Sequence, residues 1–103
     1  MKLFKKVKKI HFVGIGGAGM IGIARVLIKK GYKISGSDVV DSNDLKKLRE
    51  DGAKVYIGHN KDNIKDANLL VVSSAINQNN PELVQAKKKS ITTIPRAEML
   101  ASI

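Results

Sequence analysis

The glycine-rich run from Gly14 to Gly19 constrains the fold of this chain more than any other feature. It satisfies the pattern G-x-G-x-x-G, directly follows the apolar segment Ile10 to Val13, and precedes the apolar stretch Met20 to Lys30. Between a strand and a helix, the first glycine of this pattern permits a tight turn. The second lets backbone approach a pyrophosphate, and the third lets helix and strand pack closely. Because the amides at a helix N-terminus attract phosphate, the run predicts a phosphate-binding turn in a βαβ unit.

Apolar strand patterns and helical patterns alternate along the rest of the chain. The predicted strands are 10–13, 32–35 with its end near Asp38, 54–57, 69–72 and 91–94. The predicted helices are 20–30, the segment from an N-cap at Ser42 to a stop at Gly52, Pro81 to about Lys89, and 96–103, with 60–68 as a short helix or loop. This alternation predicts a Rossmann-like, three-layer α/β sandwich: about five parallel strands with helices on both faces and right-handed crossovers.

Asp38 follows the glycine run by nineteen residues, at the end of the second predicted strand. A carboxylate there can accept hydrogen bonds from both hydroxyls of a ribose and would repel a 2′-phosphate. A turn or capping aspartate is the alternative interpretation. The pattern does not choose among NAD, FAD and a nucleotide sugar. The motif G-x-x-x-x-G-K-[ST] is absent, as is any Ser-His-Asp or paired-carboxylate arrangement, so no catalytic residue is predicted.

Composition excludes several other classes of protein. With 103 residues the chain suits one domain. The absence of cysteine excludes disulfides, thiol catalysis and cysteine-based zinc sites, and two distant histidines argue against a metal centre. The basic start and the apolar stretch 10–28 superficially resemble a signal peptide or membrane span. Five glycines within that stretch argue instead for strand, loop and helix, so we expect a cytoplasmic protein without membrane contact.

The net charge of +10 comes largely from lysines that occur in runs. Such runs are typical of a solvated surface, of nucleic-acid binding, or of attraction for a small anionic ligand. Only four residues are aromatic, and none is interleaved with a basic cluster as a base-stacking platform would require. We therefore expect no nucleic-acid partner. A basic nucleic-acid module stays an alternative that rests on charge alone, and its binding would weaken steeply with salt.

Several motifs in the right order and spacing resemble the Mur ligase family from Ile10 onward. They are the segments 10–20, 22–24, 31–38, 57–59, 71–76 and 94–100. The resemblance is strongest to members that join L-alanine to the lactyl carboxylate of UDP-N-acetylmuramate, after ATP has phosphorylated that carboxylate. It implies that residues 10–103 form the N-terminal, UDP-binding domain behind a basic leader, 1–9. The central ATPase domain, which uses ATP and Mg, and the C-terminal domain would lie outside this chain. The fragment would then bind substrate but neither catalyse alone nor hold a cofactor.

The same resemblance implies roles for individual residues. Those expected to cradle the UDP pyrophosphate are Gly14, Gly16, Gly17, Ala18, Gly19 and Met20. Those expected to hold the uridine are Ser37, Asp38 and His59, and those expected on the phosphate and sugar side are Ser73, Ser74 and Ala75. His59 is alternatively an ordinary loop histidine, and the two serines alternatively cap the next turn. Arg96 and Glu98 belong to the site or to a domain junction.

A small NAD-binding regulatory domain of Rossmann type is the main competing interpretation. Its glycine loop and acidic residue would look the same as those of this chain. Such a domain would not need the segments 73–75 and 95–98, which the Mur ligase resemblance uses.

Overall fold

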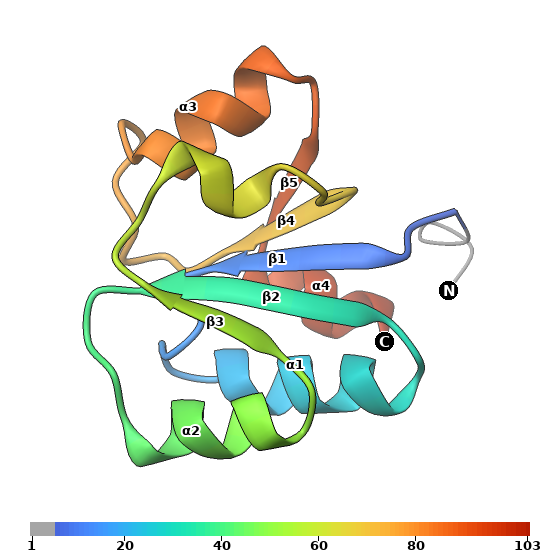
Figure 1. The fold of residues 1–103 in the computed structure, drawn as a ribbon. Helices are drawn as coiled ribbons and strands as arrows, with labels where there is room; N and C mark the ends of the chain where they lie inside the picture. The colour runs from blue at the N-terminus through green and yellow to red at the C-terminus, as the bar shows by residue number, and fades with distance from the viewer. Residues whose placement is uncertain (1–5) are drawn as a thin grey trace.

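The computed structural model describes residues 6–103 as one five-stranded parallel sheet with helices on both sides (Figure 1). The strands are β1 (Lys9–Val13), β2 (Lys33–Asp38), β3 (Lys54–Ile57), β4 (Leu69–Val72) and β5 (Thr92–Pro95). The helices are α1 (Met20–Lys29), α2 (Asn43–Glu50), α3 (Pro81–Lys88) and α4 (Arg96–Ser102), with a 3₁₀ turn, η1 (Lys61–Ile64). This architecture confirms the predicted fold class.

Most predicted boundaries are correct to within a residue or two, and the differences have local causes. Strand β1 begins at Lys9, inside the segment interpreted as a basic leader; residues 1–5 of that leader lie outside the described residues. Strand β5 begins at Thr92 rather than Ile91, because the Ile91 amide donates to the Ala86 carbonyl and completes the end of α3. Ser42 caps α2 as predicted, since its hydroxyl accepts from the Leu45 amide.

The strand order β3-β2-β1-β4-β5 places β1 at the centre of the sheet. Val13, the last residue of β1, pairs with Ser37 of β2 on one side and with Val72 of β4 on the other. The carboxyl ends of these three strands are therefore level. The chain leaves β1 toward β2 and later returns to pair β4 on the other side, so the order reverses between β1 and β4. In open parallel sheets, ligands bind at such a switch point.

The two sides of the sheet differ in what they bury. The alternation of side chains along β1 sends Ile10 and Phe12 toward α1, α2 and α4, into a large apolar cluster that we call the apolar side. Val13 packs on the opposite side, under α3 and η1, where the apolar cluster is small. This second side also buries three polar residues that hydrogen-bond to one another: His11, Ser37 and Glu82. We call it the polar side.

The apolar stretch 10–28 is divided among β1, the glycine turn and α1, as the sequence predicts. Helix α1 has 10 residues, whereas a membrane-spanning helix needs about 20. Within residues 6–103, no helix has the length and apolar character required to cross a bilayer.

Candidate functional site

A crevice of about 450 Å³ lies at the carboxyl edge of the sheet, over the switch point between β1 and β4. It is lined by the turns that follow four strands. Its lining residues are Gly14, Gly16, Gly17, Asp38, Val39, His59, Ser73, Ala75, Ile76, Asn77 and Asn80. Seven of the predicted site residues therefore meet here. Ala18, Gly19 and Ser74 are exposed beside it, whereas Ser37 and Met20 are buried.

The glycine turn is anchored to β2 by backbone bonds and by one apolar side chain. The amides of Gly14 and Ile15 both donate to the Ser37 carbonyl, at 2.9 and 3.0 Å. Gly14 has a φ of 82°, which a residue with a side chain rarely adopts. Ile15 is fully buried against Gly36, where an added Cβ would lie 2.5 Å from the Ile15 side chain. The turn is therefore held rigidly at the end of β1.

The turn presents backbone rather than side chains to the crevice. A Cβ at Gly16 would lie 2.9 Å from Oδ2 of Asp38, and one at Gly17 would lie 3.1 Å from the Gly14 carbonyl. The Ala18 and Gly19 amides make no hydrogen bond within the described residues. Helix α1 has no acidic residue in its first turn and no side-chain cap. Free amides and a positive helix end suit an anion such as pyrophosphate.

The Met20 amide is not available to such an anion. It donates to the Gly17 carbonyl at 3.0 Å, and the Met20 side chain is fully buried in the apolar side. The free donors of the turn are therefore those of Ala18 and Gly19, at the entrance to α1.

Asp38 both closes a turn with its carboxylate and lines the crevice. Its Oδ2 accepts from the Gly16 amide at 2.9 Å, and its Oδ1 accepts from the amides of Val39 and Val40, at 2.8 and 3.3 Å. The carboxylate is partly exposed and lines the crevice, so it keeps acceptor capacity for a hydroxyl. Asp38 thus ties the glycine turn to the end of β2 and also lines the crevice.

Arg96 brings a positive charge to the glycine turn. It begins α4, and a Cβ added at Gly19 would lie 3.0 Å from the guanidinium Nη1. Within residues 6–103 no carboxylate pairs with this guanidinium. From the sequence, Arg96 could belong to the site or to a domain junction; the fold places it beside the free amides.

A buried polar network supports the crevice from the polar side, and its centre is Glu82, which has no exposed surface. Oε1 of Glu82 accepts from His11 Nε2 and from Ser37 Oγ, both at 2.7 Å. Oε2 accepts from the Asn60 amide at 3.1 Å and from Asn63 Nδ2 at 2.9 Å. The network thereby joins β1, β2, the turn after β3, η1 and α3.

These bonds control the ionisation of Glu82. Burial alone would raise the pKa of its carboxyl group. The hydrogen bond and positive charge of His11, with hydrogen bonds from Ser37 and Asn63, outweigh burial and lower the pKa to about 2. Glu82 is therefore ionised at neutral pH and can only accept hydrogen bonds.

His59 and Ser37 belong to this network. Nδ1 of His59 lies 2.7 Å from Ser37 Oγ and 3.6 Å from Oε2 of Glu82, and 14% of the His59 side chain is exposed. Ser37 therefore stands behind His59 rather than in the crevice. On the opposite wall, Ser73 Oγ accepts from the Ala75 amide at 3.3 Å, so this serine caps the turn after β4. Ser73 and Ala75 also line the crevice.

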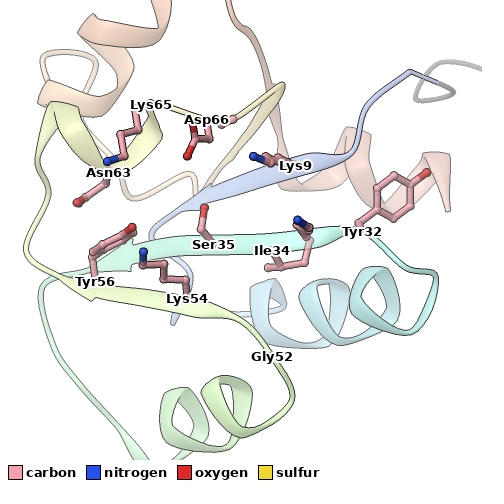
Figure 2. Close-up of a pocket in the computed structure, with 12 residues that line it drawn as sticks. Lys9, Tyr32, Ile34, Ser35, Gly52, Lys54, Tyr56, Asn63, Lys65 and Asp66 are labelled. Carbon is pink, nitrogen blue, oxygen red and sulfur yellow. The ribbon is translucent and has the colours of Figure 1, made fainter.

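A second cavity, of about 410 Å³, lies on the polar side over the face of β2 and β3, which α3 does not cover (Figure 2). Its lining includes four lysines, Lys9, Lys33, Lys54 and Lys65, together with Tyr32 and Tyr56. Lys54 Nζ lies 5.7 Å from the centre of the Tyr56 ring. None of the predicted site residues lines this cavity, so it is separate from the crevice.

Glu82 was not predicted from the sequence, nor were four residues that line the crevice: Val39, Ile76, Asn77 and Asn80. Glu82 lies in the first turn of α3, where an acidic residue is expected for helix stability alone, so its position carried no distinct signal. Val39 lines the crevice and is 68% exposed. Two adjacent valines, Val39 and Val40, stand in an otherwise polar loop, and this pattern could have predicted an apolar contact at this edge of the sheet.

Comparison with known proteins identifies the family. Residues 9–103 match the family described as "Mur ligase family, catalytic domain", which is nearly the whole chain. The chain belongs to the Mur ligase family. The resemblance predicted from the sequence motifs is therefore confirmed.

Two curated Mur ligase relatives show the degree of similarity. The chain is 54% identical over 98 residues to a UDP-N-acetylmuramate–L-alanine ligase of Sulfurihydrogenibium, covering 95% of this chain. It is 50% identical over 101 residues to the protein of the same name from Aquifex aeolicus, covering 98% of this chain. The chain spans only about a fifth of their length, 22% in each case.

Solved structures support the same family and fold. The crystal structure of UDP-N-acetylmuramate-alanine ligase MurC from Thermotoga maritima matches with a TM-score of 0.85 at 33% identity, over 89% of this chain and 21% of that one. A murein peptide ligase from Psychrobacter arcticus matches with a TM-score of 0.85 at 20% identity, over 92% of this chain and 20% of that one. The second likeness shows the fold alone.

Proposed function

We propose that this Mur ligase chain binds the UDP part of UDP-N-acetylmuramate, as the N-terminal domain of a ligase that adds L-alanine to that substrate in peptidoglycan synthesis. The observation that carries the proposal is the crevice over the switch point, where the glycine turn faces Asp38 and His59 and the free amides of Ala18 and Gly19 lie beside it. The names of the two curated relatives described above, which are 54% and 50% identical to this chain, support this choice of substrate.

Each wall of the crevice would hold one part of the ligand. The amides of Ala18 and Gly19, at the close-packed turn formed with Gly16 and Gly17, would hold the pyrophosphate, and Arg96 adds charge there. Asp38 and His59 would hold the uridine, with Ser37 behind them. On the opposite wall the amino sugar would face the turn 73–75.

The described residues do not fit ATP with magnesium. No phosphate-binding lysine motif occurs in the sequence. Within residues 6–103, no three histidine, aspartate or glutamate side chains gather closely enough to hold a metal ion. We therefore assign the ATP-dependent step to other domains of a full-length ligase, which would be partners of this one. The proposed compartment is the cytoplasm, and the absence of cysteine fits its reducing conditions.

The NAD-binding alternative has only a distant likeness behind it. The chain matches a putative NAD-dependent epimerase/dehydratase from Bacillus halodurans at 18% identity with a TM-score of 0.61, a likeness of fold alone. No observation on the described residues favours NAD over the sugar nucleotide. The nucleic-acid alternative rests on net charge without a base-stacking platform.

An amide NMR titration tests the proposal, with UDP-N-acetylmuramate in one sample and NAD in another. We expect the sugar nucleotide to shift the resonances of residues 16–19, Asp38, His59 and 73–75. Gly17→Val should abolish these shifts, because a side chain there would block the pyrophosphate. Gly22→Val is the matched control, since a Cβ at Gly22 meets no atom within 4 Å. Shifts with NAD alone, or binding that survives Gly17→Val, would contradict the proposal.

A further inference from the structure

The hydroxyl of Ser37 has a single proton and two neighbours that could receive it. Ser37 Oγ lies 2.7 Å from Oε1 of Glu82 and 2.7 Å from Nδ1 of His59. The carboxylate of Glu82 already accepts three further hydrogen bonds and has nothing to donate. Ser37 must therefore donate its proton to Glu82. Only the lone pairs of Oγ are left for His59, so the proton of that second bond lies on Nδ1.

This assignment determines what the other nitrogen of His59 can do. A neutral imidazole carries one proton, so with Nδ1 protonated Nε2 is an acceptor. Nε2 of His59 makes no hydrogen bond within the described residues, and it is not among the side-chain atoms closed off from solvent. An unconstrained histidine side chain prefers the opposite tautomer, with the proton on Nε2. The buried network therefore reverses the ordinary preference at a residue that lines the crevice.

We propose that Glu82, acting through Ser37, holds His59 in the Nδ1-protonated tautomer, so that Nε2, which is open to solvent on a residue that lines the crevice, is a hydrogen-bond acceptor. Glu82 and Ser37 are positioning residues in this arrangement, because neither reaches the ligand. Both are fully buried, and both belong to the polar side of the sheet.

The consequence for the ligand rests on the proposed function. An acceptor at Nε2 selects a ligand group that donates a proton there. In uridine diphosphate the available donors are the imide N–H of the base and the hydroxyls of the ribose. A group that offers only lone pairs would face the lone pair of Nε2 and would be disfavoured.

The tautomer can be measured in this chain without any ligand. The two histidines are the only ones in the sequence, so a long-range ¹H–¹⁵N spectrum of the imidazoles contains two rings. At about pH 8, above the ordinary histidine pKa, a protonated and a bare ring nitrogen have well-separated ¹⁵N shifts. We expect a bare Nε2 on His59 and a protonated Nε2 on His11, which donates to Glu82. A protonated Nε2 on His59 would overturn the proposal.

Three serine variants test whether Ser37 transmits the effect. Ser37→Ala removes the acceptor of Nδ1, so His59 should revert to the Nε2-protonated form. Ser37→Thr keeps a hydroxyl and should retain the wild-type tautomer. Ser35→Ala is the matched control: Ser35 lies two residues away on β2, and its Oγ bonds His11 Nδ1 at 2.7 Å. An unchanged His59 tautomer in Ser37→Ala would show that Ser37 does not transmit the effect of Glu82, and it would overturn the proposal. If that variant does not fold, the wild-type spectrum still tests the tautomer.

Binding of four nucleotides tests whether the ligand donates a hydrogen bond to Nε2. UDP is compared with 3-methyl-UDP, which lacks the imide N–H, and with 2′-deoxy-UDP and 3′-deoxy-UDP, each of which lacks one ribose hydroxyl. The derivative without the donor should bind about tenfold more weakly, the effect of one lost hydrogen bond. That difference should vanish in His59→Leu. Equal affinity of all four for the wild type would overturn the inference that the ligand donates a hydrogen bond to Nε2.

The two parts of the experiment separate the proposals. If UDP does not bind but His59 keeps its proton on Nδ1, the proposed function is refuted and the tautomer proposal stands. If UDP binds but His59 carries its proton on Nε2, the tautomer proposal is refuted and the proposed function stands.

Discussion

The apolar and polar sides of the sheet are built differently although the same strands form both. Under α1, α2 and α4 the strands bury a continuous cluster of aliphatic side chains with Phe12 among them. Under α3 and η1 the apolar cluster has four buried members, and Glu82 with its four hydrogen bonds occupies the space beside it. Adjacent residues of β1, Phe12 and His11, belong to different sides.

The difference teaches how stability and binding geometry are divided. Apolar packing is non-directional, so the apolar side holds the sheet together without specifying where any one atom must point. Hydrogen bonds to a buried carboxylate have fixed directions, and leaving one unmade is costly. The polar side therefore sets the orientation of Ser37 and His59 at the edge of the crevice.

The largest effect is expected from a cavity on the apolar side. Phe12 is fully buried at the centre of the sheet. Phe12→Ala should lower the free energy of unfolding by about 3–5 kcal/mol, because it removes apolar burial and leaves a cavity. Urea unfolding measures the loss. A change below about 1 kcal/mol would show that the apolar side is not the main source of stability.

The next effect distinguishes the polar side by its pH dependence. The pKa of Glu82 is lowered from 4.5 to about 2, so the unfolded chain binds the proton more readily than the folded one. This ionisation stabilises the fold fully above pH 4.5, and its contribution is lost as the pH falls toward 2. By linkage it amounts to about 3 kcal/mol.

Acid unfolding of Glu82→Gln measures this contribution. The variant should be less stable at neutral pH and should lose less stability than the wild type between pH 4.5 and about 2. Glu98→Gln is the matched control, because Glu98 is exposed on α4 and should keep the wild-type pH profile. Parallel acid profiles for wild type and Glu82→Gln would contradict the assignment of the network.

The smallest effect concerns a polar bond on the apolar side. Ser42→Ala removes the bond from the Leu45 amide to the Ser42 hydroxyl, 3.2 Å long, and should cost about 1 kcal/mol, the usual value of a helix N-cap. The loss should be the same at pH 7 and pH 4, and the His59 tautomer should not change. Ser102→Ala, at the exposed end of α4, is the control. A pH-dependent loss would remove the contrast between the two sides.

Much of this protein follows from local patterns that its sequence displays. The glycine run, the alternation of strands and helices, and the position of Asp38 depend on near neighbours in the chain, so the fold class and the part of the crevice lined by the glycine turn and Asp38 were predictable from them. The other predicted lining residues, His59, Ser73 and Ala75, came from the family resemblance. The motifs also indicated the Mur ligase family, which the comparisons confirm. The roles of individual site residues stay predictions that the proposed titration tests.

Only the tertiary structure decided which distant residues meet. His11 and Glu82 are 71 residues apart, and Ser37 and Glu82 are 45 apart, yet they bond because α3 packs on the polar side and its first turn brings Glu82 to both residues. Arg96 reaches Gly19 in the same way, when α4 packs beside α1. A sequence pattern records the period of each element, whereas these contacts depend on how the elements pack. The sequence therefore determined the elements and the glycine turn, and packing determined which side chains contact His59 and bring positive charge to that turn.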